Sequence, residues 1–249
     1  MIPIRDHNPS SKTPFVTYAL IAANVGAFFM YAGYLADPRL FVTFLDEYAL
    51  IPARLAEGEG YETLLTSMFI HAGLLHLGGN MLFLWIFGDN MEEAFGHLGF
   101  LLFYLAAGVA AAFAQIAMDP QSTVPMVGAS GAVAGVLGGY LLMFPKARVD
   151  ILVIFILFVG LVALPAWLVL GVWFAIQLAG SAAQYGTEGG GVAFAAHAGG
   201  FVAGLALTIP LWLARGGPGW WRSCGGRPPN PPTKVVERMS TIPRAGRRR

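Results

Sequence analysis

Long stretches without a charged side chain divide this sequence, and they limit the folds that are open to it. Residues 15–36, 63–88, 98–118 and 191–214 contain no Asp, Glu, Lys or Arg. A helix needs about 20 apolar residues to cross a bilayer, so each of these runs is long enough. Charged residues make up only 12% of the chain, whereas soluble domains carry about 25%. The sequence therefore predicts an all-α, polytopic membrane protein.

The region between residues 130 and 187 is harder to divide into helices. An apolar run from Ser130 to residue 144 predicts a fourth span, and residues 151–187 then form 37 uncharged positions, too many for one helix. Pro165 divides them, so we expect the fifth span at 165–181. Residues 151–162 are too short to cross; we expect an interfacial or partly re-entrant piece there, with a further span as the alternative. With 191–214, the prediction is a bundle of six helices.

The Lys and Arg residues predict how this bundle is oriented. Nine of the fifteen follow residue 214, and four more flank the first and fourth spans: Arg5, Lys12, Lys146 and Arg148. Six spans place all of these on one side, which the positive-inside rule assigns to the cytoplasm. The acidic loop 37–62 then lies outside. We expect a multi-pass protein of the plasma membrane, a bacterial inner membrane, with both termini cytoplasmic.

The same division gives three parts. Residues 1–13 are expected to be a cytoplasmic N-terminal segment, 14–214 the membrane domain, and 215–249 a basic, Pro- and Gly-rich cytoplasmic tail without fixed structure. The net charge of +1 argues against a nucleic-acid partner, and the single cysteine excludes a disulfide framework. The lipid bilayer is an expected partner of the chain. The sequence does not indicate an oligomeric state.

Polar side chains inside these spans are costly in lipid and therefore mark candidate functional sites. The second span holds His71, His76 and Asn80, the fourth begins with Ser130, and the sixth carries His197. His76 and Asn80 are four residues apart and share one helix face, whereas His71 lies about 140° away around the helix. Interhelical hydrogen bonding is the alternative role for this pair. A zinc site usually needs histidines four apart with a glutamate between them, so we predict no metal and no cofactor.

Small residues recur every fourth position in two spans and predict that these two helices pack closely. The fourth span carries Gly131, Gly135 and Gly139, and the sixth carries Ala196, Gly200 and Gly204. Such stripes let helix backbones approach each other. Close packing would bring the Ser130 hydroxyl to the His197 imidazole, which is the arrangement that activates a serine nucleophile.

Pro125 and Gly128 precede Ser130 and predict a loop that enters a helix at this serine. The first N–H groups of a helix have no intrahelical partner, so the Ser130 N–H would be free to bind an oxyanion. Asn80 and His76 would add side-chain donors. The spans contain no Asp or Glu that could orient His197, so the sequence predicts a dyad.

At these residues the chain resembles the rhomboid family of intramembrane serine proteases, over roughly residues 12–214. The resemblance is carried by three motifs: His76-xxx-Asn80 after His71, Gly128-x-Ser130-Gly131, and His197-Ala-Gly-Gly200-xxx-Gly204. It implies a six-helix bundle in which Ser130 is the nucleophile and His197 the general base. His76, Asn80 and the Ser130 N–H would form the oxyanion hole. His71, Glu92, Gly96 and the motif glycines would have structural roles.

The resemblance also implies the substrates, which are transmembrane segments of other proteins, usually single-pass helices that enter beside the fifth helix. Two positions depart from well-known bacterial members. Tyr61-Glu62-Thr63 stands where they carry a Trp-Arg pair, and Ala134 replaces a tyrosine that stacks on the catalytic histidine. The second change leaves open what holds the His197 ring.

Two other functions compete with a protease. A rhomboid-like pseudoprotease would bind membrane clients without cutting them, but such relatives lose the serine or the histidine, and this chain has both. A transporter or channel is disfavoured because no inverted repeat and no carboxylate within the spans is visible in the sequence.

Overall fold

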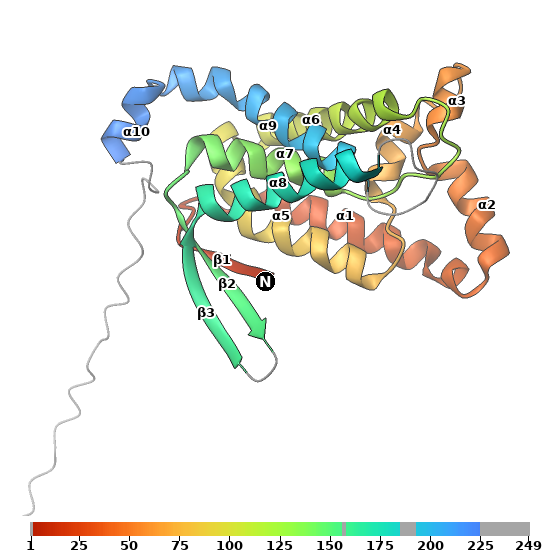
Figure 1. Cartoon of the computed structure of the whole chain (residues 1–249), viewed down its shortest axis with the longest axis horizontal. Coiled ribbons are helices and arrows are strands. Elements are labelled where there is room, and N and C mark those ends of the chain that lie inside the picture. Colours follow the sequence, from red (N-terminus) through yellow and green to blue (C-terminus); the bar gives the residue numbers. More distant parts are fainter. Residues whose placement is uncertain (1, 156–157, 185–192, 225–249) are drawn as a thin grey trace, which may run out of the picture.

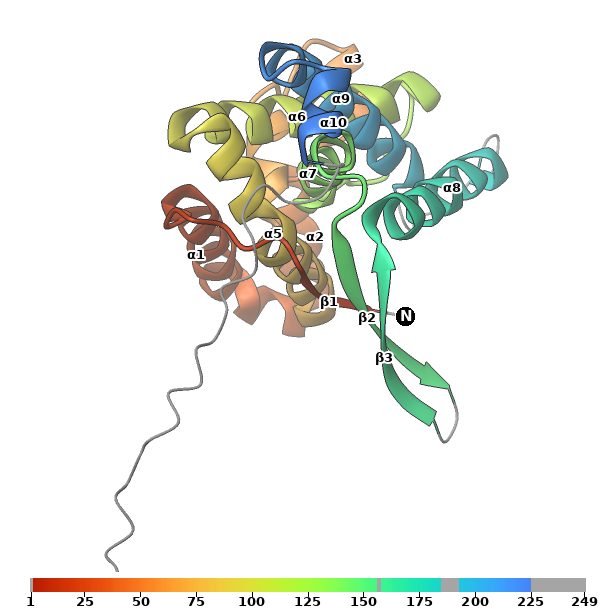
Figure 2. The same cartoon turned by 90° about the vertical axis from the view of Figure 1, so that its left-hand side faces the viewer.

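The computed structural model describes residues 2–155, 158–184 and 193–224, and most of these residues are helical. Within these ranges six helices form the bundle: α1 (Phe15–Tyr31), α5 (Leu74–Phe95), α6 (His97–Met118), α7 (Ser130–Met143), α8 (Ala166–Gln184) and α9 (Phe194–Ala214). Figures 1 and 2 show α7 in the middle of the bundle, with the other helices around it. Most of the α7 residues are buried accordingly.

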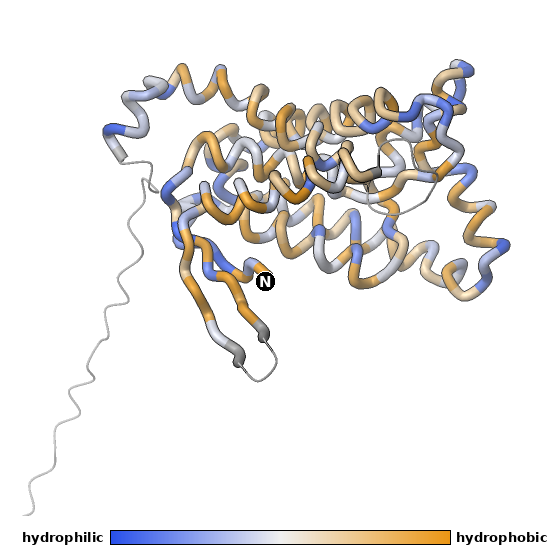
Figure 3. Tube along the Cα trace, in the orientation of Figure 1, coloured by the Kyte–Doolittle hydropathy of each residue, from blue (hydrophilic) through white to orange (hydrophobic). Residues whose placement is uncertain are grey.

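Short helices lie at one end of this bundle, within the acidic segment that follows α1. They are η1 (Ala32–Ala36), α2 (Pro38–Tyr48), α3 (Pro52–Ala56), α4 (Thr63–Thr66) and η2 (Ser67–Phe69). A β-bridge between Leu50 and Met126 joins this segment to the loop before α7, and Ala53 N donates to Ser122 O at 3.0 Å. Hydrophilic residues gather here and at the opposite end of the bundle, whereas the helices between are mainly apolar (Figure 3).

By length and composition, four of the described helices could cross a membrane. These are residues 15–36, α6, α8 up to Ala183, and α9; residues 63–95 make a fifth if the pair of helices bent by 96° counts as one span. The expected class, a polytopic helical membrane protein, is thus confirmed. The count of six stays a prediction, because the fourteen residues of α7 are fewer than the about 20 that a helix needs to cross a bilayer.

Residues 151–155 and 158–162 belong to an antiparallel β-hairpin, β2 (Arg148–Phe155) and β3 (Phe158–Pro165), which extends away from the bundle in Figure 1. These strands were not predicted from the sequence, and the interfacial or re-entrant placement of the segment stays a prediction. The N-terminal strand β1 (Ile2–Asp6) pairs with β2 and completes a three-stranded sheet of order β1-β2-β3. Val, Ile and Phe dominate β2, and β-branched and aromatic residues favour strands. The prediction used only the length of the apolar run, which distinguishes a membrane span from an interfacial segment but does not reveal a β-strand.

Ionic contacts join strand β1 to strand β2, and a hydrogen bond fixes the sheet to the bundle. Arg5 Nη2 lies 2.6 Å and His7 Nε2 2.7 Å from the Asp150 carboxylate. The Tyr140 hydroxyl of α7 donates to Asp6 Oδ2 at 2.6 Å. Burial raises the pKa of Asp6 from 3.8 to about 7, and this outweighs the opposite effect of the Tyr140 hydrogen bond. Strand β1 is therefore held at the Met143 end of α7.

A structureless tail was expected from residue 215, and this was wrong for its first part. Pro218–Cys224 form the helix α10. The indole N–H groups of Trp220 and Trp221 donate to the carbonyls of Met143 and Leu142 at 3.1 and 2.9 Å, which satisfies carbonyls left free at the end of α7. Residues 225–249 lie outside the described residues.

Glu92 joins the beginning of α1 to the end of α5. Its carboxylate accepts from the backbone N–H groups of Val16 at 2.8 Å and Thr17 at 2.7 Å, where the helix dipole favours an anion. His97 Nδ1 lies 2.5 Å from the same carboxylate. Between α5 and α6, Gly96 has a φ of 74°, a backbone conformation that suits glycine.

Candidate functional site

The site depends on the close approach of α7 and α9, which the glycines permit. A methyl group on Gly200 would lie 2.1 Å from the Gly131 carbonyl oxygen, and one on Gly204 would lie 2.0 Å from the Gly135 oxygen. On the other face of α7, methyl groups on Gly131 and Gly135 would meet alanine side chains of α6 at 2.5 and 2.4 Å. Helix α7 is therefore packed between α9 and α6 at distances that exclude side chains.

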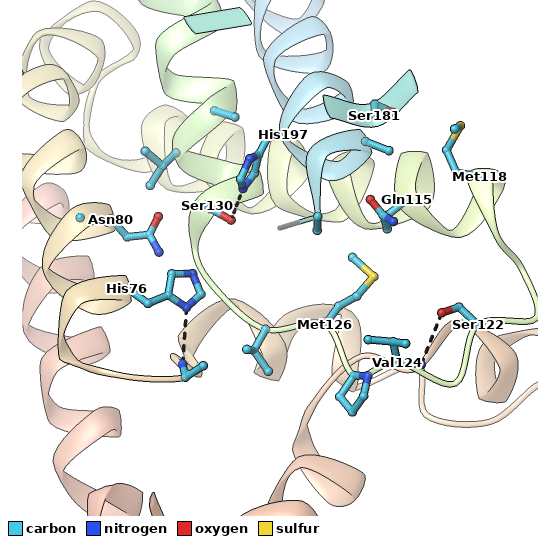
Figure 4. Close-up of a pocket in the computed structure, with 18 of the residues that line it drawn as sticks. His76, Asn80, Gln115, Met118, Ser122, Val124, Met126, Ser130, Ser181 and His197 are labelled. Atoms are coloured by element: carbon cyan, nitrogen blue, oxygen red, sulfur yellow. Dashed lines mark hydrogen bonds between the residues drawn. The ribbon is translucent and has the colours of Figure 1, made fainter. Parts of the chain in front are cut away.

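This packing brings Ser130 and His197 together. Ser130 is the first residue of α7, and its Oγ lies 2.8 Å from His197 Nε2 on α9. Both side chains are partly buried. Figure 4 shows the hydroxyl pointing at the imidazole ring across the gap between the two helices. The distance is that of a serine–base pair.

Asn80 and His76 reach the same place from α5 (Figure 4). Asn80 is 8% exposed, and its Nδ2 is buried without a hydrogen-bond partner in the part of the chain that is described. An unpaired buried donor is costly and needs an explanation. The backbone N–H of Ala72 approaches His76 Nδ1 at 3.4 Å. If Nδ1 accepts, then Nε2 carries the proton and becomes a donor.

Gly128 keeps the space between these donors and the serine open. Its φ is 124°, in the region that favours glycine, and its N–H donates to Ser67 O at 2.9 Å. A methyl group on Gly128 would lie 2.8 Å from His76 Nε2 and 3.6 Å from Ser130 Oγ. Any larger residue would therefore fill the space between His76 and Ser130.

A cavity of about 970 Å³ opens beside the pair. Its lining includes Ser130, His197, His76 and Asn80, together with loop residues such as Ser122 and Val124. The loop residues place its mouth at the end of the bundle that carries α2 and α3. Water and an extended peptide segment could reach Ser130 from this end.

His71 does not line this cavity. Its side chain is fully buried, with its ring centroid 5.0 Å from that of His76. Its backbone exchanges two hydrogen bonds with the Tyr31 hydroxyl, of 2.6 and 3.1 Å. These contacts fix the bend that precedes α5. Within the described residues, no three His, Cys, Asp or Glu side chains gather as metal ligands do.

Sequence reasoning missed two residues of α8 that contact His197. Gln177 Oε1 lies 2.8 Å from His197 Nδ1, and the Trp173 ring lies 5.9 Å from the imidazole, centroid to centroid. Gln177 is a buried amide within an apolar span, so the criterion that selected Asn80 would also have selected Gln177. Ala134, which occupies the position of the tyrosine that stacks on the histidine in well-known bacterial members, is buried.

The fold and the site together define a class: a multi-pass helical membrane protein with a serine–histidine pair in a cavity within its bundle. The model of the Rhomboid domain matches residues 58–214. The chain belongs to the rhomboid family.

Several named relatives are similar to this chain. Rhomboid protease GluP of Bacillus subtilis (strain 168) is 38% identical over 131 residues, which cover 51% of this chain and 24% of GluP. The mitochondrial Rhomboid protein 1 of Saccharomyces cerevisiae is 31% identical over 194 residues, 76% of this chain and 51% of that protein. The putative rhomboid protease YdcA of Bacillus subtilis is 36% identical over 88 residues, 35% and 43% of the two chains. The matched part thus spans about a quarter to a half of these relatives.

Proposed function

We propose that this protein is an intramembrane serine endopeptidase that hydrolyses peptide bonds in or next to transmembrane segments of other membrane proteins. The observation that carries the proposal is the 2.8 Å contact between Ser130 Oγ and His197 Nε2 inside a cavity of a membrane bundle. Membership of a family whose relatives include named proteases supports it.

In the first step, Ser130 Oγ attacks the carbonyl carbon of the scissile bond and its proton passes to His197 Nε2. The charge that develops on the carbonyl oxygen is bound by the Asn80 amide, His76 Nε2–H and the Ser130 N–H. The protonated His197 then gives its proton to the departing amine, which leaves an ester on Ser130. A water molecule, activated by the same imidazole, hydrolyses the ester and restores the serine.

The orientation belongs to the same proposal. Residues 14–214 are the protease domain in the plasma membrane, a bacterial inner membrane, and both termini are cytoplasmic. The cavity mouth then lies on the outer side, where water is available. The substrates are single-pass membrane helices. The basic residues near β1, the end of α7 and α10 support this, because β1 and α10 both contact the Met143 end of α7.

A fluorophosphonate probe tests the assignment of Ser130. The probe reacts with an activated serine and should label the wild type but neither Ser130→Ala nor His197→Ala. The same proteins should be compared in liposomes for cleavage of a single-pass substrate. Equal labelling of all three proteins would refute the proposal. An unlabelled wild type that still binds the substrate would favour a pseudoprotease.

A further inference from the structure

We propose that Gln177 is a positioning residue that sets the tautomer of His197, in the role that a carboxylate fills in a catalytic triad. The inference rests on the proposed function, because it concerns how the base of the Ser130–His197 dyad is prepared. It starts from one contact, the 2.8 Å between Gln177 Oε1 and His197 Nδ1.

The amide of Gln177 has a defined orientation. Its nitrogen, Nε2, faces the Trp173 carbonyl oxygen at 3.4 Å, so the other amide atom, Oε1, faces the imidazole. Exchanging the two atoms would set two carbonyl oxygens against each other. Gln177 is only 6% exposed, and water therefore has little access to replace either contact.

This orientation fixes the proton on the imidazole. Oε1 can only accept a hydrogen bond, so Nδ1 of His197 must donate and must carry the proton. In a neutral ring Nε2 then holds the lone pair, and this is the atom that lies 2.8 Å from Ser130 Oγ. The other tautomer would place a lone pair against Oε1 and an N–H against the serine, and it would be unable to accept the serine proton.

Helix α8 also holds the plane of the ring. Trp173 is one turn before Gln177, and its ring packs against His197 with an interplanar angle of 33°. Both contacts therefore come from one face of α8. A neutral amide suits this place, because a carboxylate buried within a membrane bundle carries a large desolvation cost.

Two substitutions separate positioning from folding. Gln177→Met keeps the side-chain length but removes the acceptor, whereas Gln177→Glu keeps an acceptor oxygen. We expect Gln177→Met to lower kcat about 10- to 1000-fold with little change in KM, since a wrong tautomer costs about 10⁴ in serine protease triads. Gln177→Glu should stay closer to the wild type. Asn24→Leu is the matched control, because Asn24 is a buried amide of α1 that donates to the Leu20 carbonyl and does not line the cavity.

Nitrogen-15 NMR of the histidine rings provides a readout that a purely structural role would not move. We expect His197 to carry its proton on Nδ1 in the wild type and in Gln177→Glu, and to populate both tautomers in Gln177→Met. This measurement needs no turnover, so it decides the inference even if Ser130 proves unreactive. A wild-type ring protonated on Nε2, or a Gln177→Met protein with unchanged kcat and tautomer, would overturn the inference and leave the protease assignment intact.

Discussion

At the scale of single residues, Asn80 is the candidate-site residue whose burial most clearly lowers the folding stability. Its amide nitrogen is buried and has no partner among the described residues. Such a group costs about 1–3 kcal/mol of folding free energy. In the proposed mechanism this donor binds the oxyanion, and a partner in the resting state would have to be displaced during the reaction.

We therefore expect Asn80→Ala to lower the cleavage rate by about 10²–10³. Its melting temperature in detergent should stay the same or rise, because no hydrogen bond of Nδ2 is lost. Asn90→Ala is the control on the same helix: Asn90 Nδ2 donates to the Asn8 carbonyl at 2.6 Å, so this variant should lose stability and keep its rate per folded molecule. A wild-type rate in Asn80→Ala would remove Asn80 from the oxyanion hole.

The sequence identified candidate functional residues where a polar side chain interrupts an apolar run, because burying such a side chain in a membrane is costly. Ser130, His197, His76 and Asn80 are polar side chains in apolar runs, and the structure brings all four to one cavity. Gln177 has the same signature, but a single amide between Trp173 and Ser181 has no motif partner in sequence. The role of Gln177 depends on which face of α8 points toward His197, and the periodicity of the sequence does not determine that.

Among the elements, α7 and α9 depend on each other through backbone atoms. Methyl groups on Gly200 and Gly204 would lie only 2.1 and 2.0 Å from carbonyl oxygens of α7, and backbone cannot move aside as a flexible side chain can. The four-residue spacing of the glycines predicted this contact from sequence because helix geometry repeats locally.

Gly204→Ala should thus separate the two helices. We expect a loss of about 1–3 kcal/mol, as for an overpacked core, and a lower melting temperature in detergent micelles. Gly171→Ala on α8 is the control, because a methyl group there would meet no atom within 4 Å. Equal melting temperatures for the two variants would contradict the close packing.

The sheet depends on a pairing that local patterns do not reveal. Strand β1 pairs with β2, and Arg5 bonds to Asp150, 145 residues further along the chain. The segment Ile2–Asp6 is only five residues long and mixes apolar with charged residues, so its sequence alone does not predict a strand. It becomes a strand because it can pair with the edge of β2.

Docking of β1 should weaken as the pH rises. The pKa of Asp6 is about 7 when folded and 3.8 as a free side chain, so the proton stabilises the docked strand. This contribution is complete below about pH 3.8 and is lost as the pH rises through 7. Asp6→Asn keeps an oxygen acceptor for Tyr140 without a charge and should remove the dependence.

Hydrogen exchange of the β1 amides measures this effect. The ratio of exchange rates between wild type and Asp6→Asn should grow from pH 4 to pH 8. Glu59→Gln, at an exposed position outside the sheet, should give a constant ratio near one. If the ratio of exchange rates between wild type and Asp6→Asn also stayed constant from pH 4 to pH 8, Asp6 would not hold a proton in the docked strand.

For the whole molecule, the proposed orientation predicts which loops an impermeant reagent can reach. Cys224 is the single cysteine, so a Cys224→Ser background permits one new cysteine at a time. Glu59→Cys, in the exposed segment before α4, should react with an impermeant maleimide in intact cells. Lys12→Cys, exposed before α1, should react only after the cells are permeabilised. The reverse pattern would invert the bundle and place the cavity mouth in the cytoplasm.

The length of α7 has a consequence for the lipid around the protein. Fourteen residues at about 1.5 Å each extend about 21 Å, whereas the hydrocarbon layer is about 30 Å thick. In the proposed orientation, the Met143 end lies at one surface, where α10 and β1 contact α7, and Ser130 would lie below the opposite surface. Hydrophobic mismatch of this kind is relieved by local thinning of the bilayer. A protease of the proposed kind would thereby shorten the distance between water and the scissile bond of a substrate helix, and a bilayer with longer acyl chains should lower its rate.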